Sequence, residues 1–208
     1  MSTAASVDAA QGSVEVTPHH LFLSREMTGD ADSRFKVNPP VRSEDERKKL
    51  WERWDRIDII ASDHAPHTME EKTLPFSRAP SGVPGVETMV PLLMAEMLNR
   101  RITLSDIIRK TATAPAALIG IPASGFTPGD RADFALYPRS ATPVNADLLH
   151  SRCGWTPFEG LPAVFPRTVL LRGEIAYCDG EFFSTHPVWY PGKGYVPNPD
   201  APDTAGDS

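Results

Sequence analysis

The chain has 208 residues, with 27 acidic and 21 basic side chains and a formal net charge of −6 at pH 7. This acidic balance, without a basic cluster interleaved with aromatic residues, argues against binding to nucleic acid or to an anionic membrane. No stretch approaches the roughly 20 apolar residues of a membrane-spanning helix, and the first residues lack the pattern of a signal peptide. A cytoplasmic protein is therefore expected, with Cys153 and Cys178 as reduced thiols.

The first part of the chain predicts a helix and two short strands. The helix begins after the Ser-Thr pair at residues 2–3 and is ended by Gly12. β-Branched residues favour a strand over residues 13–16, and residues 21–33 are polar and loop-like. A second strand is expected over residues 35–37, where prolines stop it.

A capping-box pattern that starts at Ser43 predicts a helix to about Trp54. The apolar run over residues 57–61 is typical of a strand buried on both faces. A long irregular loop is expected over residues 66–84, with the charged residues 70–72 facing solvent.

Helical patterns dominate until residue 124, and turn and strand signals dominate afterwards. The expected helices cover residues 89–98, 104–111 and 115–119, and the expected strands include a hairpin over residues 168–172 and 174–178. The last residues, 191–208, are rich in Pro, Gly and Asp and predict a disordered tail.

Chemistry-bearing residues follow three of these runs. SDHAPH at residues 62–67 follows the buried strand, TPHH at residues 17–20 follows the first strand, and NPP at residues 38–40 follows the second. In barrels of parallel strands, such residues meet at the carboxyl ends of the strands. Asp63 is thus a candidate metal ligand, general base or both. By spacing alone, an Asp that caps a turn beneath a packed His explains this cluster equally well.

Four motifs carry a resemblance to a known family: TPHHL, KVNPPVR, ASDHAPH and APSGVPGVET, at residues 17–21, 36–42, 61–67 and 79–88. In order and spacing they resemble the second half of dihydroorotases, which belong to the metal-dependent cyclic amidohydrolases. The resemblance implies an α/β fold. Residues 1–124 would form the C-terminal part of a (β/α)8 TIM-type barrel, residues 125–190 part of a small β-sandwich, and residues 191–208 the tail.

The resemblance also implies the roles of individual residues. It implies a two-metal zinc site, with His19 and Asp63 as metal ligands and Asp63 also as the catalytic base. Asn38, His67, Ser81 and Gly82 would bind the substrate. The implied reaction is the reversible ring opening of dihydroorotate to N-carbamoyl-aspartate, a step of pyrimidine biosynthesis.

The family's first five strands have no counterpart here, and no His-x-His pair occurs among the six histidines. The remaining metal ligands would then be absent, so the chain is expected to be a C-terminal fragment, inactive alone. It would associate with itself or with a complementing chain. Two alternatives remain: a hydantoinase- or allantoinase-like amidohydrolase, and a non-catalytic scaffold that pairs with aspartate transcarbamoylase.

Overall fold

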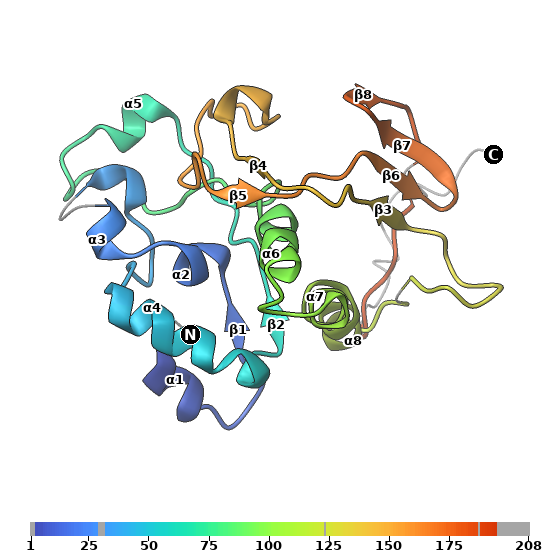
Figure 1. Cartoon of the computed structure of the whole chain (residues 1–208), viewed down its shortest axis with the longest axis horizontal. Helices are drawn as coiled ribbons and strands as arrows, with labels where there is room; N and C mark the ends of the chain where they lie inside the picture. The colour runs from blue at the N-terminus through green and yellow to red at the C-terminus, as the bar shows by residue number, and fades with distance from the viewer. Residues whose placement is uncertain (1–2, 29–31, 123, 187, 195–208) are drawn as a thin grey trace, which may run out of the picture.

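The computed structural model describes residues 3–28, 32–122, 124–186 and 188–194 (Figure 1). Its α-helices are α1 (Ala4–Asp8), α2 (Pro18–Phe22), α3 (Arg25–Thr28), α4 (Glu44–Glu52), α5 (Met69–Lys72), α6 (Met89–Leu98), α7 (Leu104–Ile108) and α8 (Ala114–Ile119). Its strands are β1 (Glu15–Val16), β2 (Ile59–Ile60), β3 (Phe134–Leu136), β4 (Thr142–Pro143), β5 (Pro162–Ala163), β6 (Thr168–Leu171), β7 (Glu174–Cys178) and β8 (Glu181–Phe182). Most of the predicted tail lies outside the described residues.

The strands β1 and β2 form a parallel pair that aligns the two ends carrying the candidate ligands (Figure 1). The backbone N–H groups of Asp58 and Ile59 donate to the carbonyl of Val14, at 2.9 and 3.1 Å. Val16 and Ile60 are buried in the core. Because the strands run the same way, the residues that follow each of them emerge on the same side of the pair.

The predicted strand over residues 35–37 is wrong. Residues Ser33–Phe35 form a 3-10 helix, which is capped by the Asp32 side chain. The run lies between the two parallel strands in sequence, but β1 pairs directly with β2 and leaves no place between them. The expected loop over residues 21–33 is also only partly correct, because it contains α3 and the end of α2.

The helix predicted after Ser43 is confirmed as α4, although it ends at Glu52 and Trp54 follows in a 3-10 turn. The rings of Trp51 and Trp54 stack at 5.2 Å and are buried. The helix predicted over residues 89–98 is confirmed as α6. The helix predicted over residues 104–111 is shorter, since α7 ends at Ile108 and a π-helical turn leads into α8.

Two apolar clusters lie on either side of α6, with Leu93 in the first and Leu92 in the second. The first holds β1 and β2 together with Trp51 of α4 and Trp54 of the 3-10 turn. The second joins Val83 to Trp155 and Phe158, so part of the chain after residue 125 packs on the segment that carries the candidate site. The division between residues 124 and 125 stays a prediction.

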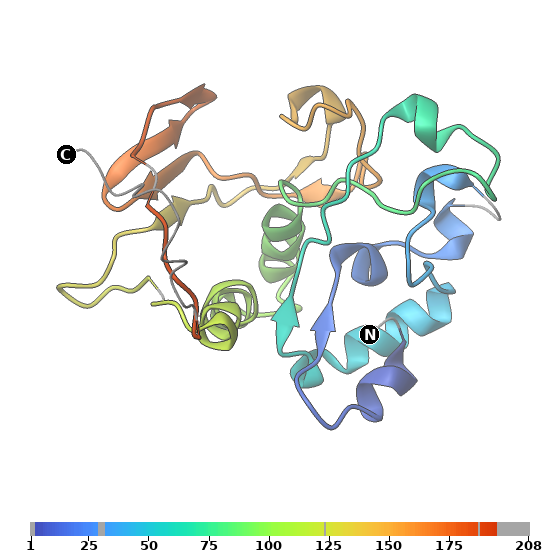
Figure 2. The same cartoon turned by 180° about the vertical axis from the view of Figure 1, so that it is seen from behind.

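The predicted hairpin is confirmed as β6 and β7, which belong to an antiparallel sheet in the order β3-β6-β7-β8. Figures 1 and 2 show this sheet and the β1–β2 pair on opposite sides of α6, α7 and α8. Cys153 and Cys178 are free thiols, as expected. In the described part of the chain, no helix is long and apolar enough to cross a membrane.

Candidate active site

His19 and Asp63 face each other beyond the ends of the parallel strands. Pro18 occupies the first turn of α2, so that helix starts directly after β1 and turns His19 inward. Asp63 follows β2 with a left-handed backbone (φ 46°), a conformation that Asp adopts more readily than most residues. His19 Nε2 lies 3.9 Å from Asp63 Oδ2, and the imidazole is buried while the carboxylate is half exposed.

Burial keeps both adjacent histidines neutral. Desolvation, with a smaller effect of His20, lowers the pKa of His19 to about 3. Desolvation likewise lowers the pKa of His20 to about 4. His20 Nε2 donates to the carbonyl of Pro39 at 3.0 Å, so its Nδ1 accepts from the Thr17 hydroxyl at 2.7 Å. His19 therefore offers a neutral imidazole, the form of histidine that binds metals.

The two candidate ligands fit a zinc ion in part. Imidazole nitrogen and carboxylate oxygen each bind zinc at roughly 2.0–2.2 Å, so two atoms 3.9 Å apart need a small adjustment, and zinc at His19 Nε2 would replace the 2.9 Å hydrogen bond of that nitrogen with Thr17 Oγ1. His19 Nδ1 is buried without a hydrogen-bond partner. In the described residues, however, no group of three or more His, Cys, Asp or Glu side chains could hold a metal. A zinc site here would therefore need ligands beyond His19 and Asp63.

The loop that contains Ser81 and Gly82 runs beside the Asp63 segment. The backbone N–H of Ala65 donates to the Val83 carbonyl at 3.1 Å. A Cβ on Gly82, whose φ is 135°, would lie 2.6 Å from the Cβ of Ala65 and 3.3 Å from the ring of His67. Glycine is therefore required here for close packing, and it brings the loop against His67.

The other residues expected to bind the substrate lie on segments that these contacts join. Asn38 and Ser81 are exposed, and His67 is partly exposed, with Nδ1 3.5 Å from Glu71 Oε2. The segment of Asn38 is tied to the histidines through the bond from His20 to the Pro39 carbonyl. It is tied to the loop because Gly82 N–H donates to the Lys36 carbonyl at 2.9 Å. The structure thus joins the segments of all six predicted residues.

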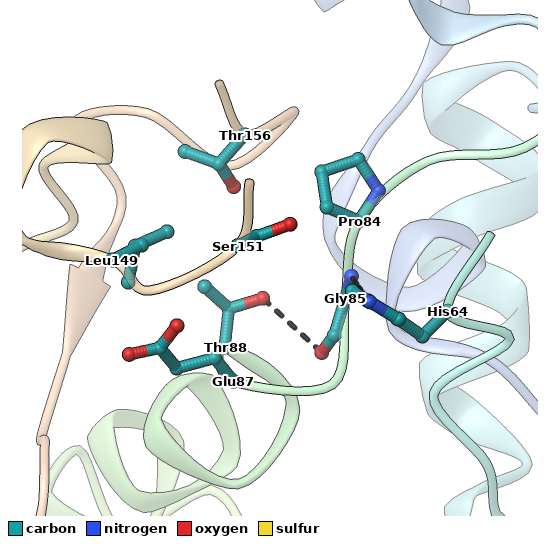
Figure 3. Close-up of a pocket in the computed structure, with 8 residues that line it drawn as sticks. All are labelled: His64, Pro84, Gly85, Glu87, Thr88, Leu149, Ser151 and Thr156. Carbon is teal, nitrogen blue, oxygen red and sulfur yellow. Dashed lines mark hydrogen bonds between the residues drawn. The ribbon is translucent and has the colours of Figure 1, made fainter. Parts of the chain in front are cut away.

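His64 anchors the turn that contains Gly85 and Val86. Its Nδ1 accepts from the backbone N–H groups of Gly85 and Val86, at 3.1 and 3.3 Å. Figure 3 shows this ring directed at Gly85, whose carbonyl also accepts from the Thr88 hydroxyl. The small hollow beside it is lined by Leu149, Ser151 and Thr156 as well.

Three residues near the site were not expected. Thr17 contacts both histidines, and its place directly before Pro18 was a usable signal. The Trp155 indole donates to the His67 carbonyl at 2.8 Å, which no local pattern indicates. Lys72 was expected to face solvent, yet its side chain is fully buried. That expectation is wrong because three backbone carbonyls surround its ammonium group.

The fold is that of the amidohydrolase class. L-Hydantoinase (dihydropyrimidinase) from Arthrobacter aurescens superimposes with a TM-score of 0.80 at 26% identity, over 88% of this chain and 45% of that one. An inactive dihydroorotase-like domain of a Chaetomium thermophilum CAD-like multifunctional protein superimposes with a TM-score of 0.61 at 16% identity, over 90% of this chain and 52% of that one. No protein-family model matches the chain.

Sequence relatives identify one family within the amidohydrolase class. A dihydroorotase of Halobacterium salinarum is 44% identical over 88% of this chain and 45% of its own length, and one of Pyrococcus furiosus is 45% identical over 81% and 40%. The multifunctional protein pyr1-3 of Dictyostelium discoideum is 38% identical over 83% of this chain and 8% of its own length. The chain belongs to the dihydroorotase family. It spans less than half the length of the two archaeal relatives.

Proposed function

We propose that this chain carries part of the active site of a dihydroorotase, which opens the ring of dihydroorotate reversibly to give N-carbamoyl-aspartate. One observation carries the proposal: a neutral, buried His19 faces the carboxylate of Asp63 at the end of a parallel strand pair. The archaeal relatives support the substrate, because they are 44% and 45% identical to this chain over the aligned residues and are named dihydroorotases.

The finer architecture is part of the same proposal. Residues 1–124 would be the C-terminal strands and helices of a TIM-type barrel, and residues 125–190 part of a β-sandwich. The parallel β1–β2 pair and the antiparallel sheet of β3, β6, β7 and β8 support this division. The metal would be zinc, and the protein would act in the cytoplasm, in pyrimidine biosynthesis.

Asp63 would move the proton in this reaction. Its half-exposed carboxylate can use Oδ2 toward the metal and the other oxygen toward a proton. It would take a proton from the attacking water and return it to the ring nitrogen as the amide bond breaks. Zinc bound by His19 and Asp63 would polarise the carbonyl and lower the pKa of water. Water is a poor nucleophile at neutral pH, so this activation is needed.

The remaining four residues would recognise the substrate. Dihydroorotate carries a carboxylate and a cyclic imide, which need hydrogen-bond donors and acceptors. His67 can donate from its ring, Asn38 can donate and accept, and the exposed Ser81 precedes Gly82 in the loop that packs on His67. Gly82 would let the loop backbone approach the ring closely.

The experiment is a turnover assay of the zinc-loaded protein isolated from its native source, with dihydroorotate, hydantoin and allantoin as substrates. We expect dihydroorotate to react fastest. Preferred turnover of hydantoin or allantoin would favour the related amidohydrolases instead. The fold likeness to an inactive dihydroorotase-like domain supports a second candidate, a scaffold without activity. That scaffold predicts no turnover and a stable complex with another protein, such as aspartate transcarbamoylase.

A further inference from the structure

Lys72 is a fully buried cation that the roles described above do not use. It is the last residue of α5, and its side chain runs beneath the loop that follows. Its Nζ donates to three backbone carbonyls: Lys36 at 3.1 Å, Pro80 at 3.0 Å and Gly82 at 2.9 Å. An ammonium group has three N–H donors, so each of them has an acceptor.

The ammonium form persists at neutral pH although it is buried. Desolvation, with the nearby Lys36 charge, lowers the pKa of Lys72 to about 8. Most molecules therefore keep all three donors at pH 7. A carbonyl that loses such a donor inside the protein is costly, so the contacts strongly favour one arrangement of the chain.

These contacts converge on the loop expected to touch the substrate. Pro80 and Gly82 flank Ser81, so Lys72 holds the backbone on both sides of that residue. The third carbonyl, of Lys36, also accepts from Gly82 N–H at 2.9 Å. The carbonyl of Gly82 therefore accepts directly from Lys72. Its N–H donates to the Lys36 carbonyl, which also accepts from Lys72 and lies two residues before Asn38.

A second lysine holds the beginning of the same loop. Lys36 Nζ donates to the carbonyls of Phe76 and Ala79, both at 2.7 Å. A segment with little regular structure is therefore fixed by side chains that reach its carbonyls. In loops of this kind, side-chain and backbone bonds replace those of a helix or sheet.

We propose that Lys72 is a positioning residue, which sets the backbone around Ser81 and Gly82 against the Asn38 segment so that this loop can bind the cyclic amide. The inference rests on the proposed function for the identity of the ligand. Its structural part, the ordering of the loop by one buried ammonium, stands on the three contacts alone.

Lys72→Met tests the proposal, because it keeps an unbranched chain and removes every donor. Lys110→Met is the matched control: Lys110 is also fully buried and donates only to backbone carbonyls, those of Trp54 and Ile57, before β2 begins. For Lys72→Met we expect the KM for dihydroorotate to rise at least about tenfold, with kcat within about threefold, because a misplaced binding loop weakens recognition. Lys110→Met should leave KM unchanged.

Amide hydrogen exchange gives a readout that does not need activity. In Lys72→Met, exchange over residues 79–85 should accelerate at least about tenfold, whereas Lys110→Met should not affect it. Absent turnover by the zinc-loaded wild-type protein isolated from its native source would defeat the proposed function, and the exchange rates would still decide the role of Lys72. Unchanged KM in an active Lys72→Met variant, or unchanged loop exchange, would overturn the inference.

A measurement on the wild-type protein covers the case in which Lys72→Met does not fold. Lysine acetylation should label Lys72 far more slowly than Lys48, whose side chain is 66% exposed. N-Carbamoyl-aspartate should slow the labelling of Lys72 further, because the occupied loop opens less often. Labelling of Lys72 as fast as that of Lys48, or labelling that the ligand does not slow, would overturn the proposal.

Discussion

Asp63 combines a carboxylate with a left-handed backbone (φ 46°), and this combination shapes the first prediction. Asn tolerates that conformation as Asp does, so Asp63→Asn should fold normally. Without a base, kcat/KM for dihydroorotate should fall about a thousandfold. The control is Asp58→Asn, whose side chain caps Val14 N–H at the opposite end of β2 and can still accept that bond. Comparable losses in both variants would contradict a catalytic role for Asp63.

Gly82 tests how closely the loop must approach the Asp63 segment. Gly82→Ala would place a Cβ 2.6 Å from that of Ala65, so the loop has to shift, and we expect KM to rise at least about tenfold. Gly173→Ala also places an L residue at a positive φ, of 85°, but nothing lies within 4 Å of its new Cβ. It should cost stability without changing KM. An equal KM for Gly82→Ala and the wild-type protein would refute the packing argument.

At the level of elements, sequence reasoning succeeded where a local pattern decides the structure. The helix α6 and the hairpin of β6 and β7 follow from apolar periodicity and turn residues, and both match the prediction. The predicted strand over residues 35–37 failed because pairing of β1 with β2 is a long-range property. The capping box at Thr68 is a local signal that predicts α5, a helix within the loop expected over residues 66–84.

In the candidate site too, local patterns predict some residues and tertiary packing determines others. Strand ends and the family motifs placed His19 and Asp63 together, and the structure brings them within 3.9 Å. The burial of Lys72 could not be predicted, since its acceptors include a carbonyl 36 positions earlier in the chain. The contact of Trp155 with the His67 carbonyl spans 88 positions. Such contacts arise from tertiary packing and leave no local pattern.

The helices α5 and α7 offer a matched test at this scale, because both begin with a capping box. Thr68→Ala and Thr103→Ala should each lower the free energy of unfolding by about 1 kcal/mol, measured by urea denaturation. Only Thr68→Ala should also raise the KM for dihydroorotate, because α5 carries Lys72. A raised KM for Thr103→Ala, or an unchanged KM for Thr68→Ala, would contradict a specific effect of the α5 cap on substrate binding.

For the whole molecule, the buried lysines predict a rise in stability with pH. Burial lowers the pKa of Lys72 from 10.5 to about 8 and also lowers that of Lys110. Between about pH 8 and 10.5 the unfolded chain binds more protons at Lys72 than the folded chain, so the free energy of unfolding increases with pH. Urea denaturation at pH 7.5 and 9.5 measures this. The rise should shrink in Lys72→Met; a rise of the same size would exclude Lys72 as its source.

The molecular surface predicts self-association. Large apolar side chains are exposed, among them Phe126 at 86%, Leu148 at 73% and Trp189 at 66%. Within the described residues β1 and β2 form a sheet of two strands, so no further strand covers its edges. In sedimentation velocity, the isolated chain should form species larger than its 22.8 kDa monomer. A monodisperse monomer at micromolar concentration would contradict this expectation.

The central claim is that His19 and Asp63 belong to a site that opens dihydroorotate. The most direct measurement is the rate of N-carbamoyl-aspartate formation by the zinc-loaded protein isolated from its native source. We expect turnover of dihydroorotate that exceeds that of hydantoin and allantoin and that falls about a thousandfold in Asp63→Asn. A folded, zinc-loaded protein that leaves dihydroorotate unchanged, or an Asp63→Asn variant with wild-type turnover, would contradict it.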